Sequence, residues 1–238
     1  MYNFLLKLNF FFYNYKIINT LNNLFKYRGW GSINVYIDIG SNVGEFFDIL
    51  KKTKVIKKTI LIEPSITSYI TLKKKYKKNK NIFIANCAIG EKKKISYLNI
   101  FSDNSFSSFY NLRKKTHFKL KKFLFRVLKI KKINKQKIIV LPLDTFLHKY
   151  KFVKSIDLIK IDVEGYELKV IKGGIKTLKK TKVLIFENHH DDSLFKTDKY
   201  PLIHKILIKN KFVLYKKIKL PFPRNSSDYF YINKALIS

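Results

Sequence analysis

Short runs of β-branched and aliphatic residues alternate with lysine-rich stretches along most of this sequence. The runs with the length and composition of strands are residues 35–40, 59–64, 82–90, 156–163, 182–188, 212–218 and 228–233. Continuous apolar runs separated by helical segments are typical of a parallel sheet covered on both faces. Helices are predicted at 43–52, 65–78, 165–180 and 198–210. The pattern therefore predicts an α/β fold with a doubly wound sheet and ligands beyond the carboxyl ends of its strands.

The charge of the chain is strongly unbalanced. Its 238 residues include 50 Lys and Arg against 16 Asp and Glu, for a formal net charge of +34. Clustered cations bind nucleic-acid phosphates. Only Arg28, Arg113, Arg126 and Arg224 are arginines, however, and the lysines are spread from end to end, which indicates compositional drift as much as a selected binding face. Both interpretations predict nonspecific attraction of anionic partners.

The length predicts one well-cored domain with a tail. We assign residues 1–33 to an amino-terminal helical extension and residues 34–238 to the domain, with a lysine-rich insertion at about 101–137. Cys87 is the only cysteine, so no disulfide framework or zinc-finger spacing is available. A reducing, cytoplasmic location is expected, and the sequence does not determine the oligomeric state.

The amino-terminal segment is apolar and aromatic but is interrupted by Lys7, Asn9, Asn14 and Lys16. No uncharged run reaches the roughly 18 residues that a transmembrane helix needs, and no signal-peptide cleavage pattern follows. One or two helices lying on the domain are expected. They either pack on the core or lie peripherally on an anionic membrane surface.

The insertion begins with a serine- and phenylalanine-rich stretch at residues 101–112 and continues with many lysines. A doubly wound sheet does not require such a segment. It is either a lid or substrate wall at the ligand edge, or a solvated loop.

Carboxylates and glycines stand where the first two predicted strands end. The first turn has the spacing Asp38-x-Gly40-x-x-x-Gly44, with Ser41 and Asn42 between the glycines. It lacks the Gly-x-Gly that lets a pyrophosphate approach the backbone, and its acid suits a ligand with a cationic amino-acid end. Glu63 ends the second strand, where an acid can accept both hydroxyls of a ribose. A nucleoside carrying an amino acid, namely S-adenosylmethionine, is the predicted cofactor.

The third predicted strand ends in small and polar residues, Asn86, Cys87 and Ala88. They are expected to contact an adenine ring. Cys87 could also indicate a cysteine nucleophile, but its position beside the cofactor base and the lack of a second cysteine favour a buried structural thiol.

The fourth predicted strand ends in Asp162-Val-Glu164-Gly165. Two carboxylates two residues apart point the same way while the strand lasts. Beside a cofactor they could position an acceptor hydroxyl, take its proton or hold a divalent cation. The alternative is that one caps a helix and the other clamps the backbone.

Six motifs occur in the order YIDIGSNVGEF, LIEPS, NCAIG, LDTFL, DLIKIDVEGYELKVIKGG and LIFENHH. Together they resemble an FkbM-type methyltransferase over about residues 35–190. The resemblance implies a class I methyltransferase, Rossmann-like sheet of about seven strands, mostly parallel with an antiparallel last strand. It also implies S-adenosylmethionine-dependent methylation of a hydroxyl on a sugar, glycan or small metabolite.

The candidate catalytic residues are Asp162, Glu164 and His189, with Asp162 or a neighbouring histidine receiving the hydroxyl proton. Asp162 is also expected to contact the cofactor. His189 and His190 precede Asp191 and Asp192, which resembles a metal-ligand cluster or an exposed polar loop. We assign no metal site, and a divalent metal is possible but not favoured.

Two alternative functions remain open at this stage. An RNA ribose 2'-O-methyltransferase would use the same cofactor and the positive surface, and Asp162, Lys182 and Glu187 could imitate part of its Lys-Asp-Lys-Glu constellation. A noncatalytic polyanion-binding protein could retain the fold, although keeping the strand-end acids in so basic a chain argues against it.

Overall fold

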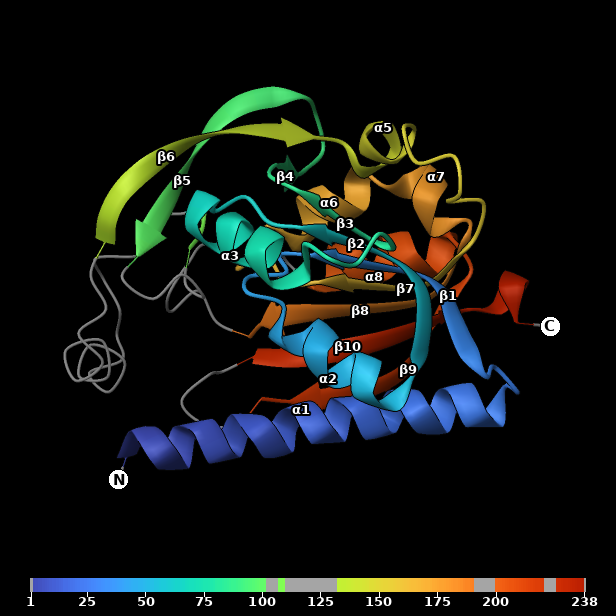
Figure 1. Cartoon of the computed structure of the whole chain (residues 1–238). Coiled ribbons are helices and arrows are strands. Elements are labelled where there is room, and N and C mark those ends of the chain that lie inside the picture. Colours follow the sequence, from blue (N-terminus) through green and yellow to red (C-terminus); the bar gives the residue numbers. More distant parts are fainter. Residues whose placement is uncertain (1, 102–106, 110–131, 191–199, 221–225, 238) are drawn as a thin grey trace.

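The computed structural model describes residues 2–101, 107–109, 132–190, 200–220 and 226–237, without the side chains of 2–11 and 132. A seven-stranded sheet lies at the centre, with helices on both faces (Figure 1). A smaller three-stranded sheet lies at one side of it. Most of the predicted lysine-rich insertion, residues 102–106 and 110–131, falls outside the described residues.

The main sheet has the spatial order β3-β2-β1-β7-β8-β10-β9. Neighbouring strands from β3 to β8 are parallel, whereas β10 is antiparallel to both β8 and β9. This arrangement confirms the predicted seven-stranded, mostly parallel sheet with an antiparallel last strand. The strands are β1 (Ser32–Ile39), β2 (Val55–Ile62), β3 (Ile82–Ala85), β7 (Ile156–Ile161), β8 (Thr181–His189), β9 (Phe212–Lys219) and β10 (Ser226–Asn233).

The two faces of the sheet bury different sets of helices, so the sheet is doubly wound. Tyr36 of β1 packs in a cluster with residues of α1 (Tyr2–Tyr27), α2 (Glu45–Thr53) and α3 (Ile66–Tyr76). Ile37 packs on the opposite side with residues of four further helices. These are α5 (Leu143–Leu147), α6 (Glu167–Lys172), α7 (Ile175–Leu178) and α8 (Tyr200–Lys209), and a short 3-10 helix, η2 (Lys234–Leu236), follows β10.

The amino-terminal segment forms one helix, α1, which runs along one side of the molecule (Figure 1). Ile17, Leu21 and Phe25 are almost completely buried against the sheet, whereas Phe12 and Tyr15 face solvent. The core-packing interpretation therefore holds for one face of this helix. Among the described residues, no helix is long and apolar enough to cross a membrane.

The predicted single strand at 82–90 was wrong. The chain leaves the main sheet after Ala85, and Asn86 donates its side-chain amide to the carbonyl oxygens of Glu63 and Pro64, both at 2.9 Å. It then enters a second sheet of order β4-β6-β5, formed by β4 (Ala88–Ile89), β5 (Lys94–Phe101) and β6 (Lys132–Leu141). The described end of the predicted insertion thus belongs to β6.

The predicted helix at 165–180 is two short helices. Gly173 and Gly174 separate α6 from α7, and a Cβ on Gly173 would lie 1.9 Å from the carbonyl oxygen of Gly90. The carboxylate of Asp144 accepts the amide of Thr177 at 2.7 Å in the first turn of α7. The close approach of the Gly173 and Gly90 backbones therefore coincides with the end of α6. The Asp144 side chain stabilises the start of α7. The other predicted helices differ by a few residues at their ends, and residues 198–199 lie outside the described residues.

Candidate active site

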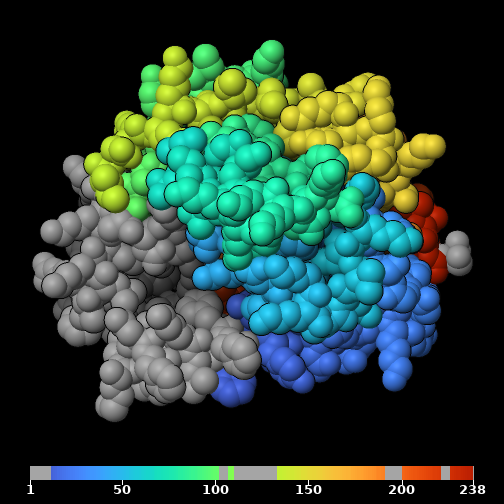
Figure 2. All heavy atoms as spheres, viewed as in Figure 1, coloured from blue at the N-terminus to red at the C-terminus, as the bar shows by residue number. Residues whose placement is uncertain are grey.

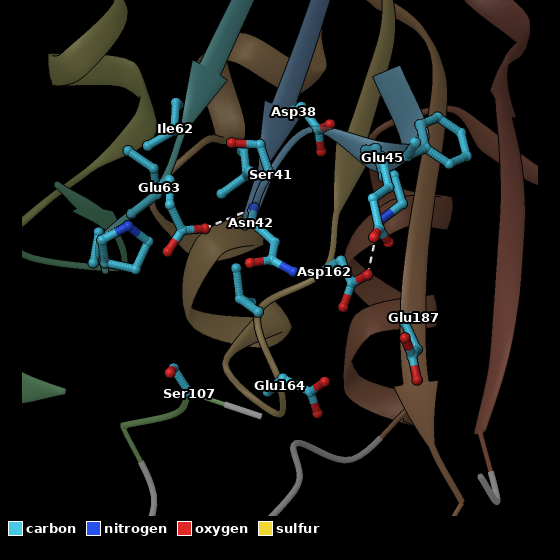
Figure 3. A pocket seen from close by; sticks show the side chains of 18 of the residues that line it. Asp38, Ser41, Asn42, Glu45, Ile62, Glu63, Ser107, Asp162, Glu164 and Glu187 are labelled. Atoms are coloured by element: carbon cyan, nitrogen blue, oxygen red, sulfur yellow. Dashed lines mark hydrogen bonds and ion pairs between the residues drawn. The ribbon is translucent and has the colours of Figure 1, made fainter. Parts of the chain in front are cut away.

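A pocket opens at the carboxyl ends of the parallel strands, between β1 and β7, where the strand order reverses. This is the usual ligand site of a doubly wound sheet. Figure 3 shows carboxylates from separate elements around one space. Among the described residues, seven acidic residues line this pocket: Asp38, Glu45, Glu63, Asp162, Glu164, Glu187 and Asp228. The pocket is therefore acidic inside a strongly basic protein.

Gly40 brings the first turn against the end of β7. Its φ is +85°, in the left-handed region, and a Cβ there would lie 1.8 Å from the carbonyl oxygen of Asp162. The amide of Asp162 donates to the carbonyl oxygen of Ile39 at 2.9 Å. Only glycine fits this close approach. The turn at Gly40 and the segment around Asp162 therefore lie against each other, and residues of both line the pocket.

Glu63 holds the same turn from the neighbouring strand. Its Oε2 accepts the amide of Asn42 at 2.8 Å (Figure 3). Its Oε1 accepts the amide of Ser65, also at 2.8 Å. Asn42 has a φ of +46°, which presents its amide to the carboxylate. Each carboxylate oxygen has a second lone pair, so Glu63 can still accept ligand hydroxyls. Burial raises the pKa of Glu63 to about 7.

Asp38 and Ser41 carry buried oxygens that face this pocket. Within the described part of the chain, Asp38 Oδ1 and Ser41 Oγ make no hydrogen bond of ordinary geometry, while the Tyr36 hydroxyl also lies near the Asp38 carboxylate. Buried polar atoms are normally paired, so two such atoms beside a pocket indicate a ligand with donors. Burial also raises the pKa of Asp38 to about 6, and a cationic ligand group would favour its ionised form.

The third group of predicted cofactor contacts is only partly in the pocket. Cys87 and Ala88 line it, whereas Asn86 clamps the end of β2 as described above. Burial raises the pKa of Cys87 to about 11, so its thiol is protonated at neutral pH, in agreement with a structural thiol. Gly44 does not line the pocket; it precedes α2, and its carbonyl oxygen accepts the Tyr76 hydroxyl.

Asp162 and Glu164 both line the pocket, but not because they share a strand face. Strand β7 ends at Ile161, and Glu164 has a φ of +50°. Asp162 instead pairs with Lys160, whose Nζ lies 2.7 Å from Asp162 Oδ2. Burial alone would lower the pKa of Lys160, but Asp162, Asp38 and Asp228 outweigh it and raise the pKa. Lys160 therefore keeps its positive charge beside the carboxylate of Asp162.

His189 lies behind Glu164 and does not line the pocket. Its Nε2 is 3.2 Å from Glu164 Oε2 and 3.9 Å from Glu187 Oε1. Burial opposes its charge, but the Glu164 contact and the Glu187 charge raise the pKa of His189 to about 9. An imidazole that is protonated at neutral pH donates hydrogen bonds and cannot accept a proton. This environment favours Asp162 over His189 as the proton acceptor.

The residues of the pocket that were not predicted include Tyr13, Lys160 and Asp228. The Tyr13 hydroxyl of α1 donates to Asp228 Oδ2 of β10 at 2.6 Å, and both residues are buried. They are separated by 215 residues in sequence, so no local pattern indicates their contact. Of these three, Lys160 alone had a local signal, because it precedes Asp162 by two residues within the predicted strand at 156–163.

Two other groups of residues were predicted, one around Lys182 and one at residues 189–192. Lys182 lies at the amino end of β8 and binds Asp157 at 2.8 Å, so it does not join Asp162 and Glu187 at the carboxyl end. The ring of His190 hydrogen-bonds to Ser227 Oγ at 2.7 Å. Asp191 and Asp192 lie outside the described residues, and among those described no group of three His, Cys, Asp or Glu residues is placed to hold a metal ion.

The strand order, the glycine turn and the acidic residues at the carboxyl ends of β1, β2 and β7 are those of the class of Rossmann-like methyltransferases. The family model described as the methyltransferase FkbM domain matches residues 38–214. The chain belongs to this FkbM methyltransferase family. No curated protein matches it in sequence.

Solved structures show the same fold at low sequence identity. The methyltransferase FkbM of Methylobacillus flagellatus KT is 18% identical with a TM-score of 0.53, over 85% of this chain and 44% of its own. This chain thus spans less than half of that protein. The magnesium protoporphyrin IX methyltransferase of Synechocystis PCC 6803, solved with bound SAM, is 10% identical with a TM-score of 0.51, over 92% and 79%. The N-methyltransferase NodS of Bradyrhizobium japonicum WM9 is 12% identical with a TM-score of 0.50, over 93% and 96%.

Proposed function

We propose that the protein is an S-adenosylmethionine-dependent O-methyltransferase that acts on a hydroxyl of a sugar, glycan or small metabolite. The observation that carries this proposal is the cofactor half of the pocket. There, Asp38 and Ser41 present unpaired buried oxygens beside Glu63 and a turn that admits only glycine at position 40, within the described residues. This donor and acceptor set fits an amino-acid end and a ribose.

We propose a role for each residue around the cofactor half of the pocket. Asp38 and Ser41, with the turn through Gly40 and Asn42, would bind the amino-acid end. Glu63 would accept the ribose hydroxyls, and Cys87 and Ala88 would contact the base. Asn86 and Gly44 would act indirectly, by holding β2 and starting α2.

The acceptor would lie against the pocket residues Asp162, Glu164, Glu187, Asp228 and Tyr13, which we call the acceptor half. When bound, the cofactor supplies an electrophilic methyl group. Asp162 would receive the acceptor proton as the acceptor oxygen forms its new bond, and Lys160 would hold the carboxylate in place. Protonated His189 would orient Glu164 toward the acceptor.

An acidic pocket also bears on the competing RNA interpretation. The net charge of +34 favours polyanions at the surface. Phosphodiesters, however, would be repelled by the carboxylates around Asp162 and Glu164. A neutral or cationic acceptor is therefore the better electrostatic match, and RNA serves as the competing substrate in the transfer experiment below.

Calorimetric titration with S-adenosylhomocysteine tests the cofactor site. The wild-type protein is expected to bind in the micromolar range. Asp38→Asn and Glu63→Gln should each weaken binding at least tenfold. Each substitution replaces a charged hydrogen-bond acceptor with a neutral amide of similar shape. Glu91→Gln is the control, since Glu91 is a partly exposed acid outside the pocket. Absence of binding by the wild type would contradict the proposal and favour a noncatalytic polyanion-binding protein.

Methyl transfer is tested with cofactor that carries a carbon-13 methyl group. Sugars, glycans, lipid-linked sugars and RNA are offered as acceptors, and the product methyl is identified by NMR as bound to oxygen or nitrogen. Asp162→Asn should lower the rate by about 100-fold or more while S-adenosylhomocysteine affinity changes by less than about threefold. Methylation of RNA alone, or transfer to nitrogen, would refute the proposed acceptor class.

A further inference from the structure

The outward face of the ribbon formed by β5 and β6 carries large apolar side chains exposed to solvent. Ile95, Tyr97, Ile133 and Ile139 are 62%, 57%, 64% and 53% exposed. Ile95 lies directly opposite Ile139 in this antiparallel pair, so these two side chains are neighbours on one face. Single exposed apolar residues are common, but four on two paired strands form a patch.

The inner face of the same ribbon already supplies the core. Leu98, Ile100, Ile138 and Val140 are buried together, and Leu98 also lines the pocket. A ribbon with one buried face normally places polar residues on the other. Among the described residues, the outward isoleucines are therefore more than half exposed and lie outside the buried cluster of the inner face.

Cations accompany the apolar side chains on the outward face. Lys135 and Lys137 lie between Ile133 and Ile139 along β6, and Lys137 lies opposite Tyr97. Neither β5 nor β6 contains an Asp or Glu. A surface that combines apolar side chains with lysines matches an anionic lipid bilayer, because the apolar groups enter the headgroup boundary while ammonium groups bind lipid phosphates.

Other partners fit this face less well. A second copy of the chain would bring Lys135 and Lys137 close to like charges on a molecule of net charge +34. Single-stranded nucleic acid needs aromatic side chains on which bases stack, and Tyr97 is the single aromatic residue among the four exposed apolar residues. Aliphatic side chains flanked by lysines favour lipid.

We propose that the outward face of the β5–β6 ribbon docks the protein on the surface of an anionic membrane. Figures 1 and 2 show this ribbon at the rim of the molecule, above α3. Asn99 of β5 forms a bridge with Ser108, whose Oγ donates to the carbonyl oxygen of Glu164 at 2.9 Å. The ribbon is thus linked to Glu164, which lines the pocket. The proposal does not depend on the reaction in the pocket.

Vesicle co-sedimentation tests the docking face without changing the net charge. The probes are vesicles of phosphatidylcholine with about one quarter phosphatidylglycerol and vesicles of phosphatidylcholine alone. Wild-type protein is expected to bind the anionic vesicles and not the neutral ones. The double variant Ile95→Ser/Ile139→Ser should bind at least tenfold more weakly, because it keeps every lysine and loses apolar insertion.

The matched control is Leu202→Ser/Ile208→Ser on α8, whose side chains are also about half exposed. This control should bind like the wild type, and thermal unfolding verifies that both double variants are folded. Equal binding of the β5–β6 variant and the wild type would overturn the proposal, as would absence of wild-type binding to anionic vesicles. Self-association in sedimentation velocity that only the β5–β6 variant removes would assign the face to a second copy instead.

Discussion

Replacing Gly40 with alanine is expected to abolish cofactor binding and to destabilise the fold. The added Cβ would lie 1.8 Å from the carbonyl oxygen of Asp162, and alanine is strained at a φ of +85°. The turn must move away from β7, which separates the Gly40–Asn42 turn from Asp162. We expect S-adenosylhomocysteine affinity to fall more than 100-fold and the free energy of unfolding to fall by about 3 kcal/mol.

Two other glycines provide matched controls for this variant. Gly173→Ala also meets a backbone carbonyl, at 1.9 Å, but Gly173 does not line the pocket. It should lower the free energy of unfolding while the folded protein keeps its cofactor affinity. Gly31 has no atom within 4 Å of an added Cβ, so Gly31→Ala should change neither quantity. Calorimetry and urea unfolding measure both, and retained affinity in Gly40→Ala would refute the assignment of this turn.

Replacing Glu167 with glutamine is expected to change how stability depends on pH. Glu167 Oε1 accepts the amide of Gly165 at 3.1 Å, and burial raises the pKa of Glu167 to about 8. A carboxyl whose folded pKa exceeds its unfolded pKa destabilises the folded state as it ionises. The wild type therefore loses stability relative to Glu167→Gln as the pH rises from about 4.5 to 8, by about 1.4 kcal/mol per pH unit.

Neighbouring charges affect this prediction and must be accounted for. His189 has a folded pKa of about 9, so its contribution to stability is present below its usual pKa and is lost as the pH rises through 9. This loss extends over the range between the usual pKa of 6.5 and the folded pKa of about 9. Urea unfolding at pH 5 and 6.5 therefore stays below that range, and at pH 8 the loss through His189 occurs in both proteins, so the difference between the wild type and Glu167→Gln is the quantity compared. Glu91→Gln is the control, because a partly exposed ion pair should contribute about 0.5 kcal/mol or less. Parallel pH profiles for wild type and Glu167→Gln would show that Glu167 titrates like an exposed acid.

The order of strands and helices was predictable because each element has a local signal. Val35 to Ile39 is a continuous apolar run that ends in a turn, and the structure makes it the central strand β1. Where a local signal and a long-range contact favoured different structures, the long-range contact determined where the strand or helix ends. Asn86 is held by the backbone of β2, which breaks a run that reads as one strand, and Gly173 meets Gly90, which divides a helix.

The same distinction between local signals and long-range contacts applies to the candidate site. Residues at the carboxyl end of a strand, such as Asp38, Glu63 and Asp162, were predictable because the carboxyl ends of parallel strands meet at one edge. Tyr13 and Asp228 were not, since their pairing depends on how α1 and β10 pack on the sheet. The predicted role of His189 as a base also rested on its position in sequence, whereas its charge depends on Glu164 and Glu187 around it.

By itself, the sequence determined the α/β class and the family, because periodicity and short motifs are properties of neighbouring residues. The tertiary structure alone decided which carboxylates share the pocket, that Lys160 pairs with Asp162 there and that the β5–β6 ribbon turns isoleucines outward. The physical reason is that burial, charge pairing and exposure depend on contacts between residues far apart in the chain, and no local pattern records those contacts.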